Sequence, residues 1–136
     1  MSKGELTYKE FLDFYGEDWS TCKPLDVRTI GELPELQGIY EVRTKNYSFP
    51  RLRGTSSVLY IGSATSPYGL KKRIKSLIKG RHIARKRIQG IAAELKIELE
   101  FRYKGDLQAK QAEKDALKEY ENKHLELPPC NHNIPK

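Results

Sequence analysis

Strict alternation of polar and apolar side chains over residues 96–103 restricts the fold more than any other feature of this chain. The apolar positions are Ile97, Leu99, Phe101 and Tyr103, and only lysine, glutamate and arginine stand at the other positions. A period of two is typical of a strand with one buried face. The pattern therefore predicts a half-buried strand, and with it a sheet.

Two shorter segments rich in strand-forming residues, 38–43 and 58–62, predict a hairpin with a long connection over 44–56. Residues 17–36 read as irregular. Helical spacing of apolar residues marks four other segments: 7–16, 68–79, 84–95 and 107–125. The expected order is helix, strand, strand, helix, helix, strand, helix. Few strands and several helices predict a small α/β fold with a mainly antiparallel, three-stranded sheet flanked by helices.

The length of 136 residues favours one compact domain with a single core. Hydrophobic residues make up 38% and charged residues 32%, which is typical of a soluble globular protein. No apolar run is long enough to cross a bilayer, and residues 1–10 contain no hydrophobic run of a secretory signal. Cys22 and Cys130 lie in no Cys-X-X-Cys or Cys/His cluster, so we expect two reduced thiols, no structural zinc and a cytoplasmic location.

The charge is distributed unevenly along the chain. The net charge is +7, and residues 42–93 hold 13 of the 25 Lys and Arg residues but none of the 18 Asp and Glu residues. A solvated protein face usually mixes both signs. A long stretch without acidic residues favours a surface that binds polyanions, of which the phosphate backbone of nucleic acid is the commonest.

Several short motifs stand in a fixed order on the expected elements. Gly-Ile-Tyr at 38–40 opens the first strand, and Tyr-Ile-Gly at 60–62 ends the second. Arg73 lies on the helix that follows, Glu119 lies on the last helix, and Asn131 follows a Pro-Pro-Cys segment. Each motif alone is weak evidence, but the ordered set resembles the GIY-YIG nuclease superfamily from about residue 33 to residue 131.

The resemblance implies a fold, an activity and a set of site residues. Residues 60–73 are similar to the N-terminal nuclease domain of the bacterial excision-repair nuclease, which implies a nuclease-like domain over 33–136 behind an N-terminal helical extension over 1–32. The expected activity is metal-dependent endonucleolytic hydrolysis of phosphodiester bonds in DNA, with a role in repair or restriction. The residues that match the motifs are Tyr40, Tyr60, Arg73, Glu119 and Asn131.

These residue types suit phosphodiester hydrolysis. One Mg²⁺, held by Glu119, would act as a Lewis acid on the phosphate and would lower the pKa of water; whether Mn²⁺ serves as well is open. The guanidinium of Arg73 offers a planar set of donors for developing negative charge. A tyrosine hydroxyl can orient or deprotonate the attacking water. The Asn131 side chain is uncharged, so it can orient a bound group but cannot neutralise its charge. Glu113 and Glu121 are rival glutamates on the same helix, and Asn133 is the alternative to Asn131.

The sequence departs from the family pattern at two places. Where members commonly carry a histidine or tyrosine one helical turn after the arginine, this chain has Leu77. His82 follows nine residues after Arg73 and is the substitute we expect, as a base or as a phosphate contact. The connection between Tyr40 and Tyr60 is also longer than usual. It carries basic and aromatic residues that suit a substrate-recognition loop, with a flexible insertion as the alternative.

The basic residues expected to contact nucleic acid belong to the long connection, the first basic helix and the segment after it: Arg51, Arg53, Lys71, Lys72, Lys75, Arg81 and Arg85. DNA is the expected partner, RNA is not excluded, and no membrane contact is expected. A homodimer or a partner protein would supply the specificity that no separate domain of this chain supplies. The alternative functions are a nucleic-acid-binding module of the same fold without activity, which Leu77 favours, and a structural basic protein.

Overall fold

The computed structural model describes residues 19–66 and 69–132. The helix expected over 7–16 and the alternative residue Asn133 lie outside these residues. The elements are, in chain order, β1 (Lys23–Pro24), α2 (Val27–Ile30), β2 (Gly38–Thr44), β3 (Phe49–Pro50), β4 (Thr55–Ser56), β5 (Val58–Ala64), α3 (Gly69–Lys79), α4 (Arg85–Leu95), β6 (Leu99–Gly105) and α5 (Ala109–His124).

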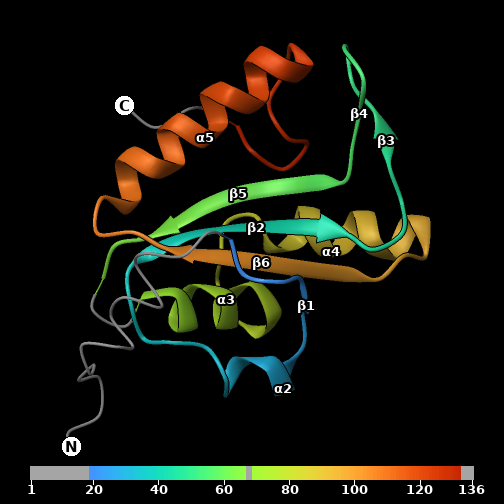
Figure 1. Cartoon of the computed structure of the whole chain (residues 1–136). Coiled ribbons are helices and arrows are strands. Elements are labelled where there is room, and N and C mark those ends of the chain that lie inside the picture. Colours follow the sequence, from blue (N-terminus) through green and yellow to red (C-terminus); the bar gives the residue numbers. More distant parts are fainter. Residues whose placement is uncertain (1–18, 67–68, 133–136) are drawn as a thin grey trace, which may run out of the picture.

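An antiparallel sheet with the strand order β1-β6-β2-β5 forms the centre of the fold. The expected hairpin of β2 and β5 is present, and β6 pairs with the other side of β2. Figure 1 shows α5 along one face of this sheet and α3 and α4 on the opposite side. The α/β class and the mainly antiparallel sheet flanked by helices are therefore confirmed.

The expectation of three strands was wrong, because the main sheet has four strands and β3 and β4 form a separate two-stranded sheet. The three additional strands are two residues long, so they contain no alternation that a sequence pattern could reveal. Pro24 and Pro50 are the last residues of two of these strands. Proline has no N–H to donate to a neighbouring strand, so it is tolerated at the end of a strand this short. The segment read as irregular also contains α2, whose first amides are capped by the Asp26 carboxylate.

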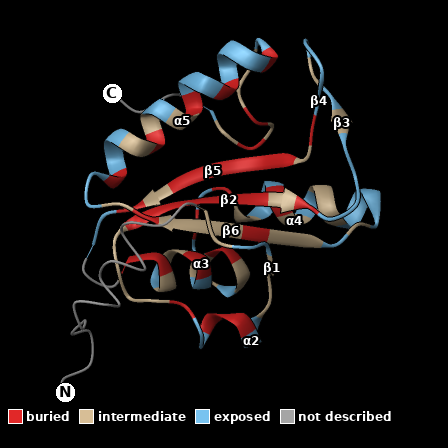
Figure 2. Cartoon of the chain, viewed as in Figure 1, coloured by how far each residue is buried: buried red, intermediate tan, exposed pale blue. Residues whose placement is uncertain are grey.

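Each face of the sheet packs against its own apolar cluster. Tyr40, Val42 and Phe101 belong to a cluster that includes buried residues of α3 and α4, whereas Val58 and Ile61 pack with Leu117 of α5. Figure 2 shows the buried residues concentrated along β2 and β5. The strand with strict alternation begins later than expected, at Leu99, because Lys96 ends α4 in a left-handed conformation (φ 55°). Its apolar positions face the first cluster, as the pattern predicts.

The two motif glycines are required by close packing. A Cβ at Gly38 would lie 2.3 Å from the carbonyl oxygen of Lys104, on the neighbouring strand. A Cβ at Gly62 would lie 2.5 Å from both Cζ and Oη of Tyr40, which packs over it. A β-bulge beside Val42 places both Leu59 and Tyr60 in the first cluster. The motif residues thus bring the two tyrosine rings together on one face of the sheet.

Replacing Gly62 with alanine should destabilise the fold by about 1–3 kcal/mol, because the Tyr40 ring is fully buried and has no room to move away. Gly90→Ala is the matched control. A Cβ at this exposed helical position meets nothing within 4 Å and should stabilise the protein by roughly 0.4–1 kcal/mol. Urea denaturation of the three proteins measures both changes. Equal stability of G62A and the wild type would contradict the packing argument.

Candidate active site

Side chains from four separate segments meet beside β2. The Tyr40 hydroxyl lies 2.7 Å from Nε2 of His82, and Nη2 of Arg73 lies 3.2 Å from the same nitrogen. The ring of Tyr60 contacts the ring of His82 edge-on at 5.2 Å and lies 6.1 Å from the ring of Tyr40. Four of the residues predicted from the sequence thus form one cluster, which we call the tyrosine–histidine cluster.

The chain reversal after α3 brings His82 to this cluster. The backbone amides of Gly80 and His82 both donate to the carbonyl of Ser76. A Cβ at Gly80 would lie 2.6 Å from Cα of Ser76, so a glycine is needed for the chain to turn this tightly. Leu77, at the position where the family carries histidine or tyrosine, is buried in the core instead. An imidazole therefore reaches Tyr40 from the loop rather than from the helix.

The surroundings of His82 determine which nitrogen carries its proton. The backbone N–H of Ala84 donates to Nδ1 at 3.0 Å, so the neutral ring carries its hydrogen on Nε2 and donates it to the Tyr40 oxygen. In this tautomer Nη2 of Arg73, which is also a donor, makes no hydrogen bond to Nε2 at their distance of 3.2 Å. Burial, together with the Arg73 charge, lowers the pKa of His82 to about 4, so the ring is neutral at neutral pH.

Both tyrosines are held in the phenol form. Burial raises the pKa of Tyr40, with a further contribution from Tyr60. Burial also raises the pKa of Tyr60, and the negative charge of Glu113 adds to this, while Arg73 acts in the opposite direction. Tyr40 is fully buried and Tyr60 is 9% exposed, so Tyr60 is the tyrosine that retains some access to solvent.

Two arginine side chains near the cluster have donors without partners. Nε of Arg73 and Nε of Arg85 are buried, and neither has a hydrogen-bond partner. Among the described residues, no carboxylate forms an ion pair with either arginine. Buried donors without partners are costly, and a bound oxyanion would satisfy them.

Glu113, and not Glu119, is the glutamate within electrostatic reach of the tyrosines. Its carboxylate is 7% exposed, accepts a hydrogen bond from the Ser63 hydroxyl at 2.6 Å and raises the pKa values of Tyr40 and Tyr60. Among the described residues, no group of three or more His, Cys, Asp or Glu side chains is arranged to hold a metal ion. One buried carboxylate nevertheless suits Mg²⁺, which keeps most of its waters.

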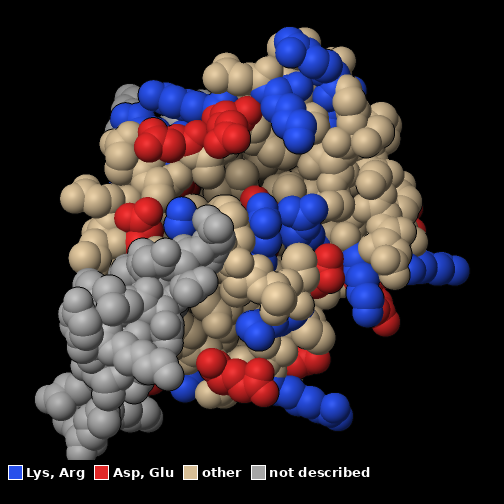
Figure 3. Space-filling view, in the orientation of Figure 1, with Lys and Arg blue, Asp and Glu red and all other residues tan. Residues whose placement is uncertain are grey.

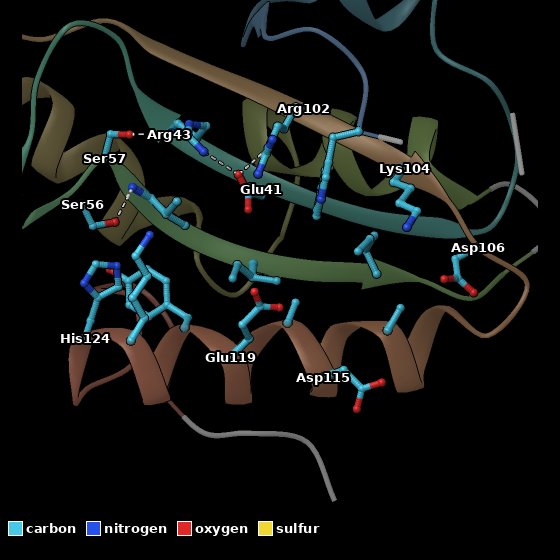
Figure 4. Close-up of a pocket in the computed structure, with 18 of the residues that line it drawn as sticks. Glu41, Arg43, Ser56, Ser57, Arg102, Lys104, Asp106, Asp115, Glu119 and His124 are labelled. Atoms are coloured by element: carbon cyan, nitrogen blue, oxygen red, sulfur yellow. Dashed lines mark hydrogen bonds and ion pairs between the residues drawn. The ribbon is translucent and has the colours of Figure 1, made fainter. Parts of the chain in front are cut away.

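Glu119 lies six residues after Glu113 on the same helix, α5, but its side chain is placed differently. It is exposed and lines a cavity of about 810 Å³ between α5 and the sheet. Figure 4 shows its side chain extending toward the strands that carry Glu41, Arg43 and Arg102. Figure 3 shows the hollow, with acidic and basic side chains mixed around it. The structure therefore does not bring Glu119 to the tyrosine–histidine cluster.

Asn131 is placed beside β5 by a pair of hydrogen bonds. Its side-chain oxygen accepts from the Ile61 N–H at 3.0 Å, and its side-chain amide donates to the Ile61 carbonyl at 2.9 Å. The N–H of Cys130 also donates to Leu59, so this segment covers the outer edge of β5. Because both ends of the amide are engaged, Asn131 protects a sheet edge in this structure.

Comparison with known proteins yields no relative. No protein-family model, no curated protein and no solved structure shows a significant match to the chain.

The residues predicted to contact nucleic acid differ in their availability. Arg51 is held by an ion pair with Glu126 at 2.9 Å and by the Leu127 carbonyl, so its side chain is only 10% exposed. The long connection that carries it forms the β3–β4 hairpin, which is attached to His124 through the backbone of Arg53: its N–H donates to the His124 carbonyl, and its carbonyl accepts from Nδ1 of the His124 ring. This anchoring disagrees with the alternative of a flexible insertion.

Of the remaining basic residues, Lys71 approaches Glu35 at 3.8 Å and Arg85 is partly buried. The other four are exposed: Arg53, Lys72, Lys75 and Arg81. The part of the chain that the structure describes contains no helix long and apolar enough to span a membrane.

The lowered pKa of His82 predicts a pH dependence of stability. The folded protein favours the neutral His82 ring, so the stability that this ring contributes is complete above 6.5, its pKa in the unfolded chain. That stability is lost as the pH falls from 6.5 toward 4, the pKa in the folded protein. His82→Gln keeps an N–H donor but does not titrate. Between pH 7 and pH 4 the wild type should lose about 2 kcal/mol more unfolding free energy than H82Q. Urea denaturation at both pH values measures this, and parallel losses would show that the ring is not held neutral.

Proposed function

We propose that this protein is a metal-dependent endonuclease that hydrolyses phosphodiester bonds in DNA. The observation that carries the proposal is the half-buried Arg73 side chain, whose buried Nε has no partner, beside two tyrosines and a histidine. Nε of Arg51 is also buried without a partner, but Nη2 of that arginine binds Glu126 and Leu127, whereas no carboxylate among the described residues forms an ion pair with Arg73. A bound phosphate would complete the contacts of Arg73.

Each side chain has a distinct role in this proposal. Arg73 binds the scissile phosphate and stabilises the charge that develops on its oxygens. Tyr60, which keeps some exposure to solvent, contacts the attacking water. Tyr40, itself held by its hydrogen bond with His82, packs against the Tyr60 ring and keeps it in place. Glu113 would hold Mg²⁺ or Mn²⁺ in place of Glu119. When bound, the ion supplies Lewis acidity to the phosphate and lowers the pKa of water.

The surface charge supports a nucleic-acid substrate. Residues 42–93 contain no acidic side chain, and α3, α4 and the loop that carries His82 all belong to this stretch. Exposed Arg81 directly precedes His82, and exposed Lys72 directly precedes Arg73. The cations nearest in sequence to the cluster are therefore available to the phosphates on either side of the one that is cut.

Glu113→Gln should abolish the cleavage of supercoiled plasmid in the presence of Mg²⁺, while Glu119→Gln should cut like the wild type. The reason is that only Glu113 is in electrostatic reach of the tyrosines. Gel electrophoresis of nicked and linear products measures cleavage, EDTA serves as the metal-free control, and fluorescence anisotropy confirms that the variants still bind DNA.

The reverse result, with activity lost in E119Q and kept in E113Q, would assign the metal to the cavity that Glu119 lines between α5 and the sheet. Binding without cleavage by the wild type on plasmid, branched and single-stranded DNA alike would favour an inactive nucleic-acid-binding module of the same fold.

Arg81→Ala should weaken DNA binding and reduce the slope of log K against log salt by about 0.9, because one phosphate contact is removed. Arg51→Ala is the matched control, since its guanidinium already binds Glu126 and Leu127. That variant should lose stability and keep the wild-type salt slope. Titrations of a labelled duplex at several salt concentrations measure both slopes. A lower slope in R51A alone would show that the β3–β4 hairpin, and not the His82 loop, contacts the backbone.

A further inference from the structure

Ile83 is exposed next to the tyrosine–histidine cluster. Its side chain is 80% exposed, although its neighbours His82 and Ala84 are 5% and 3% exposed. Single exposed apolar residues are common and need no explanation by themselves. Ile83 differs because its position is fixed by the cluster and because it lies close in sequence to Arg81 and to Arg85, whose buried Nε has no hydrogen-bond partner among the described residues.

Hydrogen bonds on both sides hold the backbone at Ile83. The Ala84 N–H donates to the His82 ring, the Arg85 N–H donates to the His82 carbonyl at 3.1 Å, and the Ile88 N–H donates to Ala84 at 3.0 Å. The His82 ring is itself fixed by Tyr40. Ile83 cannot turn inward unless His82 leaves Tyr40, so the fold presents this aliphatic side chain to solvent at a defined place.

Positive charge surrounds this position in the chain. Arg81 is exposed two residues before Ile83, and Arg85, two residues after it, has a buried Nε without a partner. Arg73, which also has such a donor, contacts the neighbouring His82. A protein partner would require a larger apolar patch than one isoleucine between arginines. A single exposed isoleucine between arginines that can bind phosphate is instead well placed to contact the bases of a nucleic acid.

We propose that Ile83 is a wedge that enters the base stack beside the phosphate bound by Arg73, so that the preferred substrate is duplex DNA with an unpaired base. This rests on the proposed function and extends it to a substrate class. Apolar side chains inserted at a base step unstack it, and unstacking costs least where a base is already unpaired or mismatched. The wedge therefore favours flexible or defective steps without reading a sequence.

The test uses duplexes with 2-aminopurine next to a one-base bulge, together with fully paired duplexes, all in EDTA so that no cleavage occurs. Wild-type protein should raise the 2-aminopurine fluorescence and should bind the bulged duplex more tightly than the paired one. Ile83→Ala should lose most of the fluorescence rise and bind the bulged duplex about 5- to 20-fold more weakly, with little change for the paired duplex. Leu52→Ala removes another exposed aliphatic side chain that stands between two arginines, at 73% exposure, and should behave like the wild type.

An unchanged fluorescence rise and an unchanged preference in I83A would overturn the wedge, as would equal losses in I83A and L52A. Thermal unfolding should show the same midpoint for both variants, which excludes a folding defect. Adding Mg²⁺ then separates the two proposals. A wild type that distorts the bulged duplex but never cuts it supports the wedge and contradicts the nuclease, whereas a wild type and I83A that cut bulged and paired duplexes in the same ratio contradict the wedge alone.

Discussion

The buried hydrogen bond between His82 and Tyr40 is the interaction on which the site depends. It joins β2 to the loop after α3, between residues 42 positions apart in the sequence, at a distance of 2.7 Å. Its geometry requires three local conditions: no side chain at Gly62, a tight chain reversal at Gly80, and the Ala84 N–H that leaves His82 with its proton on Nε2. A buried bond with a donor and an acceptor both satisfied resists rearrangement, since breaking it would leave two polar groups unpaired.

The alternation ending at Tyr103 and the hairpin of β2 and β5 could be predicted from the sequence because both follow from local periodicity. The approach of His82 to the tyrosines was expected from the resemblance, as a substitute at the site for the residue that Leu77 replaces, and not from a local pattern. The two-residue strands and the four-residue helix α2 could not be predicted, since such short elements complete no period.

The choice of glutamate could not be made from spacing along the chain. The resemblance implies that Glu119 and Asn131 belong to one site, whereas in the structure Asn131 pairs with the backbone of β5 and Glu119 lines the cavity under α5. A different signal was present in α5. Its buried positions include Ala109, Glu113 and Leu117, so a carboxylate stands within an otherwise apolar stripe. A charge in such a stripe is costly without a partner, and Glu113 accepts from Ser63 and approaches Lys110 at 3.8 Å. Burial is therefore what distinguishes Glu113 from the exposed Glu119 and Glu121.

Electrostatic pairing explains why the cavity between α5 and the sheet is a weaker candidate for binding phosphate than the tyrosine–histidine cluster. In the cavity under α5, one carboxylate oxygen of Glu41 accepts from Arg43 at 2.8 Å and from Arg102 at 2.6 Å, so both cations are already bound to a carboxylate, although its one negative charge balances only one of them. Acidic residues of α5 line the same cavity and would repel a polyanion. At the tyrosine–histidine cluster, Arg73 meets only uncharged side chains and keeps an unsatisfied donor. A phosphate gains most where the positive charge is not already paired, so we expect it at the tyrosine–histidine cluster.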